Sequence, residues 1–168
     1  MPVINYDIYD PYKVDFDKFS NKYVLFEEFS RKLRLLSDSM KDILWDTHTS
    51  SVIFSMHLEY GLNDQQSANL TRIIRDVLLC DLYIGDLPNL LKQNVGIDEK
   101  SAQEIASRIV SEIFKTALDD IKKIQVKKFA DRIVSKKPFI PKNTTNPPSS
   151  QQKTPIAQGN VINLRKET

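Results

Sequence analysis

Two short stretches, 35 residues apart, repeat one pattern of residue types and constrain the fold more than any other feature. YGLNDQQSANLTRII begins at Tyr60, and VGIDEKSAQEIASRIV begins at Val95. In each, an apolar residue precedes a glycine, a second apolar residue follows it, and an Asn or Asp then opens a helical period. Glycine tolerates the left-handed conformation that ends a helix, and Asn or Asp caps the next one. The repeat therefore predicts two helix–turn–helix hairpins.

The apolar positions on both sides of these glycines align at the same offset. The aligned pairs are Val52 with Leu87, Met56 with Leu91, Leu70 with Ile105, Ile74 with Ile109 and Leu78 with Ile113. Asn63 with Gln66 forms the first cap, and Asp98 forms the second. A single hairpin cannot bury its apolar face alone, so we expect the two to share one core in a compact bundle. Chance similarity of two capped amphipathic helices is the alternative.

An aromatic helical period precedes the repeat. From Asp15 onward, apolar residues follow i, i+3, i+4 spacing at Phe16, Phe19, Tyr23, Phe26, Phe29, Leu33 and Leu36. We expect this face to pack in the core; the alternative is a helix that docks in a partner's groove. Residues 1–14 carry Tyr6, Tyr9 and Tyr12, which we expect to pack as an arm rather than to serve as an adhesive tail.

These patterns predict an all-α fold: a compact bundle of five or six helices with two helix–turn–helix hairpin units and a disordered C-terminal tail. Only 4 of the 168 residues are glycine and 40% are apolar, which suits a helical domain. We divide the chain into an N-terminal aromatic arm (1–14), a helical domain (15–135), a flexible linker (136–160) and a terminal short motif (161–168). The predicted core contains Phe26, Phe29, Leu33, Leu44, Ile53, Met56, Leu70, Ile74, Leu78, Leu91, Ile105, Ile109, Ile113 and Phe114.

Charge is distributed unevenly along the chain. Residues 1–120 hold 13 Lys/Arg and 20 Asp/Glu, a net of −7, whereas residues 121–142 hold 8 Lys/Arg and one acid, a net of +7. The basic segment contains Lys122, Lys123, Lys127, Lys128, Arg132, Lys136 and Lys137. If this basic segment has a function, we expect it to contact nucleic acid or an anionic surface. We favour a solubilising helix end, because the segment lacks stacked aromatics and any recognisable groove-reading motif.

A small apolar cluster with two basic residues closes the chain. Val161, Ile162 and Leu164, followed by Arg165 and Lys166, lie beyond the polar stretch NTTNPPSSQQKTPIAQG. This stretch has the composition of a flexible tether. The layout is typical of a short motif that adds to another protein as a strand or fills its groove, with an unselected chain end as the alternative.

Catalytic and cofactor signatures are not apparent. His48 and His57 are nine residues apart, which places them on opposite sides of a helix, and the three glycines before residue 100 are isolated. The single cysteine, Cys80, gives no disulfide framework and is expected to be a buried or incidental thiol. We therefore expect no metal, nucleotide or covalent cofactor, no small-molecule substrate and no catalysis.

Several features together favour a cytoplasmic location. No apolar run approaches the roughly 18 residues that a transmembrane helix needs. The opening MPVINYDIYDPY lacks the basic flank and apolar stretch of a secretory signal.

The span from Ser39 to Ile124 resembles small uncharacterised helical proteins of candidate-phylum bacteria. The matching stretches are IL-W-D at Ile43–Asp46, YGLNDQQ, RDVLLCDLYIGDLPNLL, VGIDEKSAQEIA and SEIF. The resemblance covers about half the chain and implies an all-helical domain without an assigned activity.

The most concrete functional prediction is a non-enzymatic protein–protein interaction module, an adaptor or small subunit of a larger assembly. In it, the helical body and the tethered C-terminal motif each contact another protein, so that two modest contacts reinforce one another. The alternative is a protein associated with nucleic acid or an anionic surface through the basic 122–137 segment.

Overall fold

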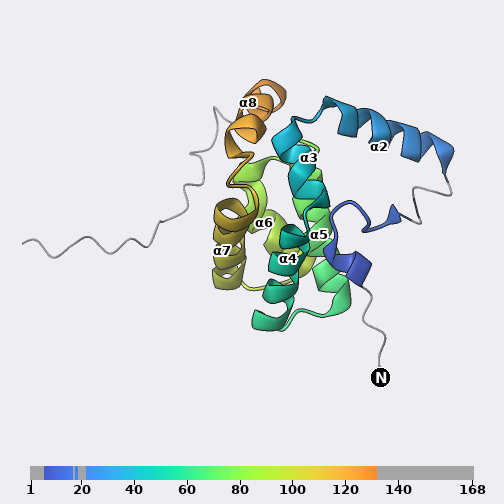
Figure 1. The fold of residues 1–168 in the computed structure, drawn as a ribbon. Helices are drawn as coiled ribbons and strands as arrows, with labels where there is room; N and C mark the ends of the chain where they lie inside the picture. The colour runs from blue at the N-terminus through green and yellow to red at the C-terminus, as the bar shows by residue number, and fades with distance from the viewer. Residues whose placement is uncertain (1–5, 17, 19–21, 132–168) are drawn as a thin grey trace, which may run out of the picture.

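The computed structural model describes residues 6–16, 18 and 22–131, which form helices and turns with no β-strand among them (Figure 1). The single-turn helical elements are η1 (Tyr6–Tyr9), η2 (Ile84–Asp86), η3 (Leu91–Val95) and η4 (Ile109–Ile113). The α-helices are α2 (Tyr23–Leu35), α3 (Asp38–Trp45), α4 (Thr47–Glu59), α5 (Asp64–Leu78), α6 (Leu87–Leu90), α7 (Glu99–Arg108) and α8 (Leu118–Lys128). The described part is therefore all-helical, with more α-helical segments than the sequence predicts because short ones such as α6 are counted separately.

The left-handed glycines and the helix N-caps predicted at the two turns are confirmed. Gly61 and Gly96 have φ angles of +60° and +74°, the left-handed values that glycine adopts without a Cβ penalty. Asn63 and Gln66 form a reciprocal capping box at the start of α5. The Asp98 side chain accepts hydrogen bonds from the backbone N–H groups of Lys100 and Ser101 at the start of α7. Each of these two turns links a shorter helical segment to a longer one: α4 to α5, and η3 to α7.

Helix α5 occupies the centre of the fold. It contacts α3 and α4, the π-helical turn η3 that follows α6, and the N-terminal η1. Its fully buried side chains include Leu70, Ile74, Val77 and Leu78. These positions recur at helical spacing, so one sequence pattern supplies the face on which the other helices pack.

The predicted core is confirmed at twelve of its fourteen positions and differs at two. Phe26 is 39% exposed, and Leu33 is only partly buried. Both residues lie on α2, whereas every predicted core residue on α3 to α7 and in η3, η4 and the turn after η4 is buried. The core therefore belongs to the helices after residue 38, and α2 is attached to it from outside.

The predicted aromatic helix is interrupted. Its period begins at Asp15, and Phe16 and Lys18 are helical, but Lys22 is extended and α2 begins at Tyr23. Asp15 itself has a φ of +69°. A left-handed residue interrupts helical propagation, so the chain turns at Asp15. Residues 6–16 instead lie against the body, with Tyr9 and Val14 buried. In Figure 1, α2 runs along one edge of the molecule, away from the helices around α5.

Two buried side chains, Ile121 and Gln125, attach helix α8 to the body, and Gln125 does so through hydrogen bonds. Gln125 is 1% exposed, its Oε1 accepts a hydrogen bond from the Ile84 N–H and its Nε2 donates one to the Leu82 carbonyl, both at 2.9 Å. Asp81, in the same connection after α5, accepts hydrogen bonds from Lys32 of α2 at 2.9 Å and from Lys128 of α8 at 3.2 Å. Residues 79–84, which lead from α5 into η2, therefore form hydrogen bonds with both peripheral helices, α2 and α8.

Candidate interaction site

The outer face of α2 carries three strongly exposed apolar side chains. Tyr23, Val24 and Leu35 are 79%, 74% and 77% exposed. Tyr23 and Val24 lie at the start of the helix and Leu35 at its end, so a partner that covers the length of α2 would bury apolar side chains at both ends. The prediction that the aromatic face of this segment packs in the core is therefore wrong for Tyr23 and Phe26, as it is for Phe16, which is 37% exposed.

Charged residues occupy the middle of the same outer face. Glu27, Arg31 and Arg34 are all exposed and, with Val24 and Glu28, line a shallow hollow of about 310 Å³. Helical geometry places Val24, Glu27, Arg31 and Arg34 within one stripe of about a third of the helix circumference. The outer face thus has apolar residues at its two ends and charges of both signs between them.

The inner side of α2 rests on a cluster of aromatic rings. Phe29 is buried, and its ring centroid lies 6.1 Å from that of Tyr12. Tyr12 also lies 5.9 Å from Trp45, and Phe16 lies 6.4 Å from Phe26. Tilted and edge-on ring pairs at these separations are favourable. The arm therefore supplies the side chains that support α2.

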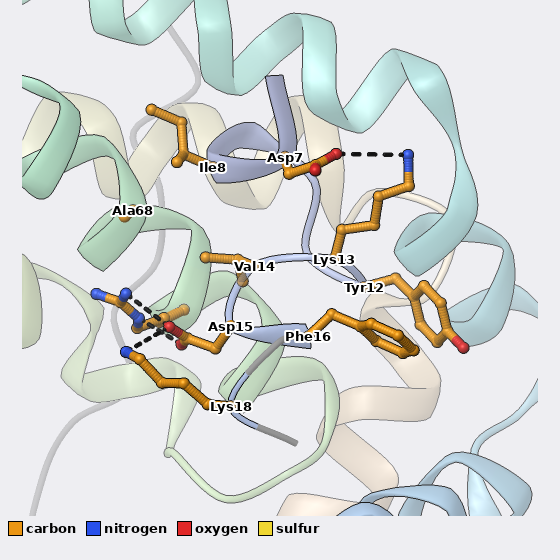
Figure 2. Close-up of a pocket in the computed structure, with 10 residues that line it drawn as sticks. Asp7, Ile8, Tyr12, Lys13, Val14, Asp15, Phe16, Lys18 and Ala68 are labelled. Carbon is orange, nitrogen blue, oxygen red and sulfur yellow. Dashed lines mark hydrogen bonds and ion pairs between the residues drawn. The ribbon is translucent and has the colours of Figure 1, made fainter. Parts of the chain in front are cut away.

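The arm is held in turn by an ion-pair cluster at the residue that follows it, Asp15, beside a cavity of about 480 Å³ shown in Figure 2. The Asp15 carboxylate accepts hydrogen bonds from Arg72 of α5 and from Lys18, the latter at 2.7 Å. Arg75 donates to the Val14 carbonyl at 2.9 Å. The Arg72 guanidinium holds the pKa of Asp15 well below its usual range, and Asp15 in turn raises the pKa of Arg72.

Because Asp15 and Arg72 neutralise one another, the cavity wall is better explained as an attachment of the arm to α5 than as a ligand site. This attachment was not predicted. The two residues are 57 positions apart, and neither has a local signature. Only the helical break at Asp15 could have indicated a special backbone there.

The predicted basic segment is only partly described. Lys122, Lys123, Lys127 and Lys128 lie on α8 and are exposed; Arg132, Lys136 and Lys137 fall outside the described residues. Lys128 is paired with Asp81, while Lys123 and Lys127, one turn apart, line a groove with Leu35 at the end of α2 and Leu36 just after it. Lys122 lies about 100° around the helix from Lys123. The four lysines therefore do not form one continuous stripe.

The predicted tail motif, Val161, Ile162, Leu164, Arg165 and Lys166, lies wholly outside the described residues. Its role as a binding motif stays a prediction.

The two histidines have different surroundings. His57 Nδ1 is hydrogen-bonded to Ser67 Oγ at 2.9 Å and stacks on Phe54, whereas His48 is exposed. Within the described ranges, no group of three or more His, Cys, Asp or Glu side chains is arranged to hold a metal ion. Across those same ranges, no helix has both the length and the apolar character to cross a bilayer.

No protein-family model, curated protein or solved structure matches this chain. The resemblance to small bacterial helical proteins therefore stays a prediction, and the described residues that point to a function lie on the surface of α2.

Proposed function

We propose that the chain is a non-enzymatic protein-interaction module, an adaptor or small subunit of a larger assembly, whose main contact surface is the outer face of α2. The observation that carries this proposal is the exposure of Tyr23, Val24 and Leu35 on a helix that is anchored to the body on its other side by the buried Phe29. Burying large apolar side chains contributes about 1.5–3 kcal/mol each, so an exposed set gives a partner a substantial driving force.

The way in which α2 is held supports the same proposal. Phe29 and Leu36 are buried, and Lys32 is paired with Asp81. The inner side thus fixes the orientation of the helix and leaves Tyr23 and Val24 exposed at its start, with Leu35 exposed beside the groove next to α8. A preordered surface loses less conformational entropy on binding than a disordered one, which favours association.

The test is affinity purification with three full-length forms of the protein. The first is wild type, the second carries Tyr23→Ser, Val24→Ser and Leu35→Ser, and the third carries Leu58→Ser and Val126→Ser. Leu58 and Val126 are matched controls, since they are 63% and 55% exposed but lie on α4 and α8. We expect the α2 variant to lose its protein partners and the control to keep them. Equal recovery by all three would contradict the proposal.

The C-terminal motif is a second proposed contact and needs its own arm of the experiment. A chain ending at residue 150 lacks Val161, Ile162 and Leu164 but keeps α2. If two tethered contacts reinforce one another, this truncation weakens partner recovery without abolishing it. Unchanged recovery would remove the tail from the proposal and leave α2.

The alternative function, association with nucleic acid or an anionic surface, receives less support. Lys123 and Lys127 share one face of α8, but Lys128 already has a carboxylate partner. If the basic segment binds phosphates, affinity for a DNA duplex falls steeply with salt, and charge reversal at Lys127 and Lys128 reduces it. No binding at low salt would dismiss this alternative.

We also propose that the segments on either side of Gly61 and Gly96 derive from one duplicated hairpin unit. The support is the shared left-handed glycine followed two residues later by an Asn or Asp cap. Separate exchange of each glycine-to-cap turn for the other, with retention of the fold measured by circular dichroism, tests whether the two are equivalent.

A further inference from the structure

Residues of matching or complementary type lie at equal distances on either side of the midpoint of α2, and this arrangement indicates the kind of partner. Phe29 is the midpoint of the helix Tyr23–Leu35. Tyr23 and Leu35 lie six residues before and after it, and both are more than three-quarters exposed. Glu27 and Arg31 lie two residues before and after it, with opposite charges. Reversing the direction of the helix therefore brings an apolar residue to the level of an apolar residue and an acid to the level of a base along the axis.

These positions correspond in space when two copies of α2 lie antiparallel. A helix rises about 1.5 Å per residue, so Tyr23 and Leu35 each lie about 9 Å from the midpoint, and Glu27 and Arg31 each lie about 3 Å from it. Tyr23 of one copy then reaches the level of Leu35 of the other. Glu27 reaches the level of the other Arg31, with the other Arg34 one turn beyond. A two-fold axis through the midpoint makes each contact occur twice.

We infer that the outer face of α2 binds the outer face of α2 in a second copy of this chain, forming an antiparallel two-fold dimer. The inference rests on the proposed function and names its partner. Charge complementarity argues for a second copy, because the same helix supplies both the acid and the base at matched levels. A partner helix of one charge sign would meet either Glu27 or Arg31 unfavourably.

The size of the contact predicts a weak dimer. A pair of thirteen-residue helices buries less surface than the roughly 1,200–2,000 Å² of a stable interface. We therefore expect a concentration-dependent equilibrium that is half complete between about 1 μM and 1 mM.

The decisive experiment uses charge reversal in the full chain. Glu27→Arg places arginine against Arg31 twice in a homodimer, and Arg31→Glu places glutamate against Glu27 twice. Each single variant is expected to dimerise at least about tenfold more weakly than wild type. In a mixture of the two variants, both contacts become Arg–Glu pairs, so the mixture is expected to form the heterodimer. Sedimentation equilibrium of each variant and of the mixture measures the three constants.

The mixture also separates dimerisation from helix stability. Residues 27 and 31 are one turn apart on the same helix, so each single variant also introduces a like-charge pair within α2. That internal repulsion is identical in the separate and mixed samples, and any gain on mixing is therefore intermolecular. Lys100→Glu on α7 is the matched control, because it places a like charge beside Glu104 on another exposed face. We expect it to dimerise like wild type.

The outcomes distinguish this inference from the proposed function. Wild type that stays monomeric to about 1 mM overturns the dimer, and so does a mixture that associates no better than its components. If wild type is monomeric while the Tyr23, Val24 and Leu35 variant loses a different protein partner, the interaction module stands and its partner is another chain. If wild type is monomeric and no partner depends on α2, both proposals fail.

Discussion

Both carboxylate oxygens of Asp15 accept hydrogen bonds from the guanidinium of Arg72, from Nε at 2.5 Å and from Nη2 at 2.8 Å. The pair joins the N-terminal arm to the central helix α5. It has the bidentate geometry in which arginine binds carboxylates most strongly. The side chain of Asp15 is 10% exposed and that of Arg72 26%, so solvent screens the pair less than an ordinary surface ion pair. The position of the arm under α2 therefore depends on this contact.

We predict that Asp15→Asn lowers the free energy of unfolding by about 2 kcal/mol, because it removes charge-assisted hydrogen bonds and leaves Arg72 partly buried without its counter-ion. Asparagine tolerates the left-handed φ of +69°, so the substitution isolates the charge. Chemical denaturation of wild type and variant measures the difference. Asp42→Asn, at an exposed position of α3, is the control and is expected to change stability by less than about 0.5 kcal/mol. A variant as stable as wild type would show that the pair contributes nothing.

The same pair predicts a specific response to acid. In the folded protein the pKa of Asp15 lies below its ordinary value of 3.8, so between the two pKa values the unfolded chain binds the extra proton. The contribution of Asp15 is thus fully present above about pH 4 and is lost as the pH falls toward the folded pKa. Burial raises the pKa of Asp76, which acts in the opposite direction, but this effect is common to wild type and Asp15→Asn. We expect the stability difference between the two proteins to shrink below pH 3.8 in denaturation curves measured across the acid range. A difference independent of pH would contradict this.

The bridge made by Gln125 predicts a second large loss of stability. Gln125→Leu removes the acceptor for the Ile84 N–H and the donor for the Leu82 carbonyl, and both backbone groups are partly buried. We expect a cost of about 2–3 kcal/mol in the free energy of unfolding. Gln103→Leu is the matched control, because Gln103 is exposed on α7 and its hydrogen bond to Glu99 is accessible to water. If thermal unfolding shifts equally for the two variants, Gln125 does not fix α8.

The single cysteine provides a reporter of unfolding. Cys80 is 3% exposed, and burial raises the pKa of its thiol from 9.0 to about 11. Since the thiolate is the reactive form, a rise of two pKa units alone lowers the reactive fraction near neutral pH about 100-fold. We expect Ellman's reagent to modify the native protein at least this much more slowly than the denatured one. Rapid, stoichiometric reaction of the native protein would mean that the connection around Cys80 opens.

Local signals in the sequence predicted the turns because each turn depends on a few adjacent residues. The capping box of Asn63 and Gln66, the cap at Asp98 and the left-handed Gly61 and Gly96 all form within four residues of chain. The buried faces of α5 and α7 also follow from periodicity, because both helices carry a continuous apolar stripe.

The exposure of α2 could not be predicted in the same way. Periodicity shows that Tyr23, Phe26 and Phe29 share a helix, but not whether another element covers them. Phe29 is buried because it lies on the inner side of α2, and Tyr23 is 79% exposed because it lies on the outer face. Likewise Asp15 with Arg72, and Gln125 with Leu82, are paired by tertiary geometry across 57 and 43 positions.

The carboxylate of Asp81 is shared by Lys32 of α2 and Lys128 of α8. An anion that binds Lys128 would break its ion pair with Asp81, and Asp81 would then pair with Lys32 alone. A partner that binds Lys32 would likewise leave Asp81 paired with Lys128 alone. Binding of a ligand at one helix thus changes the binding free energy at the other helix. By thermodynamic linkage this change is the same whichever ligand binds first. For ion pairs as accessible as these the coupling amounts to about 1 kcal/mol or less, weakened further by salt. Asp81 is thereby the shared counter-ion of two chemically different surfaces, the one on α2 and the one on α8.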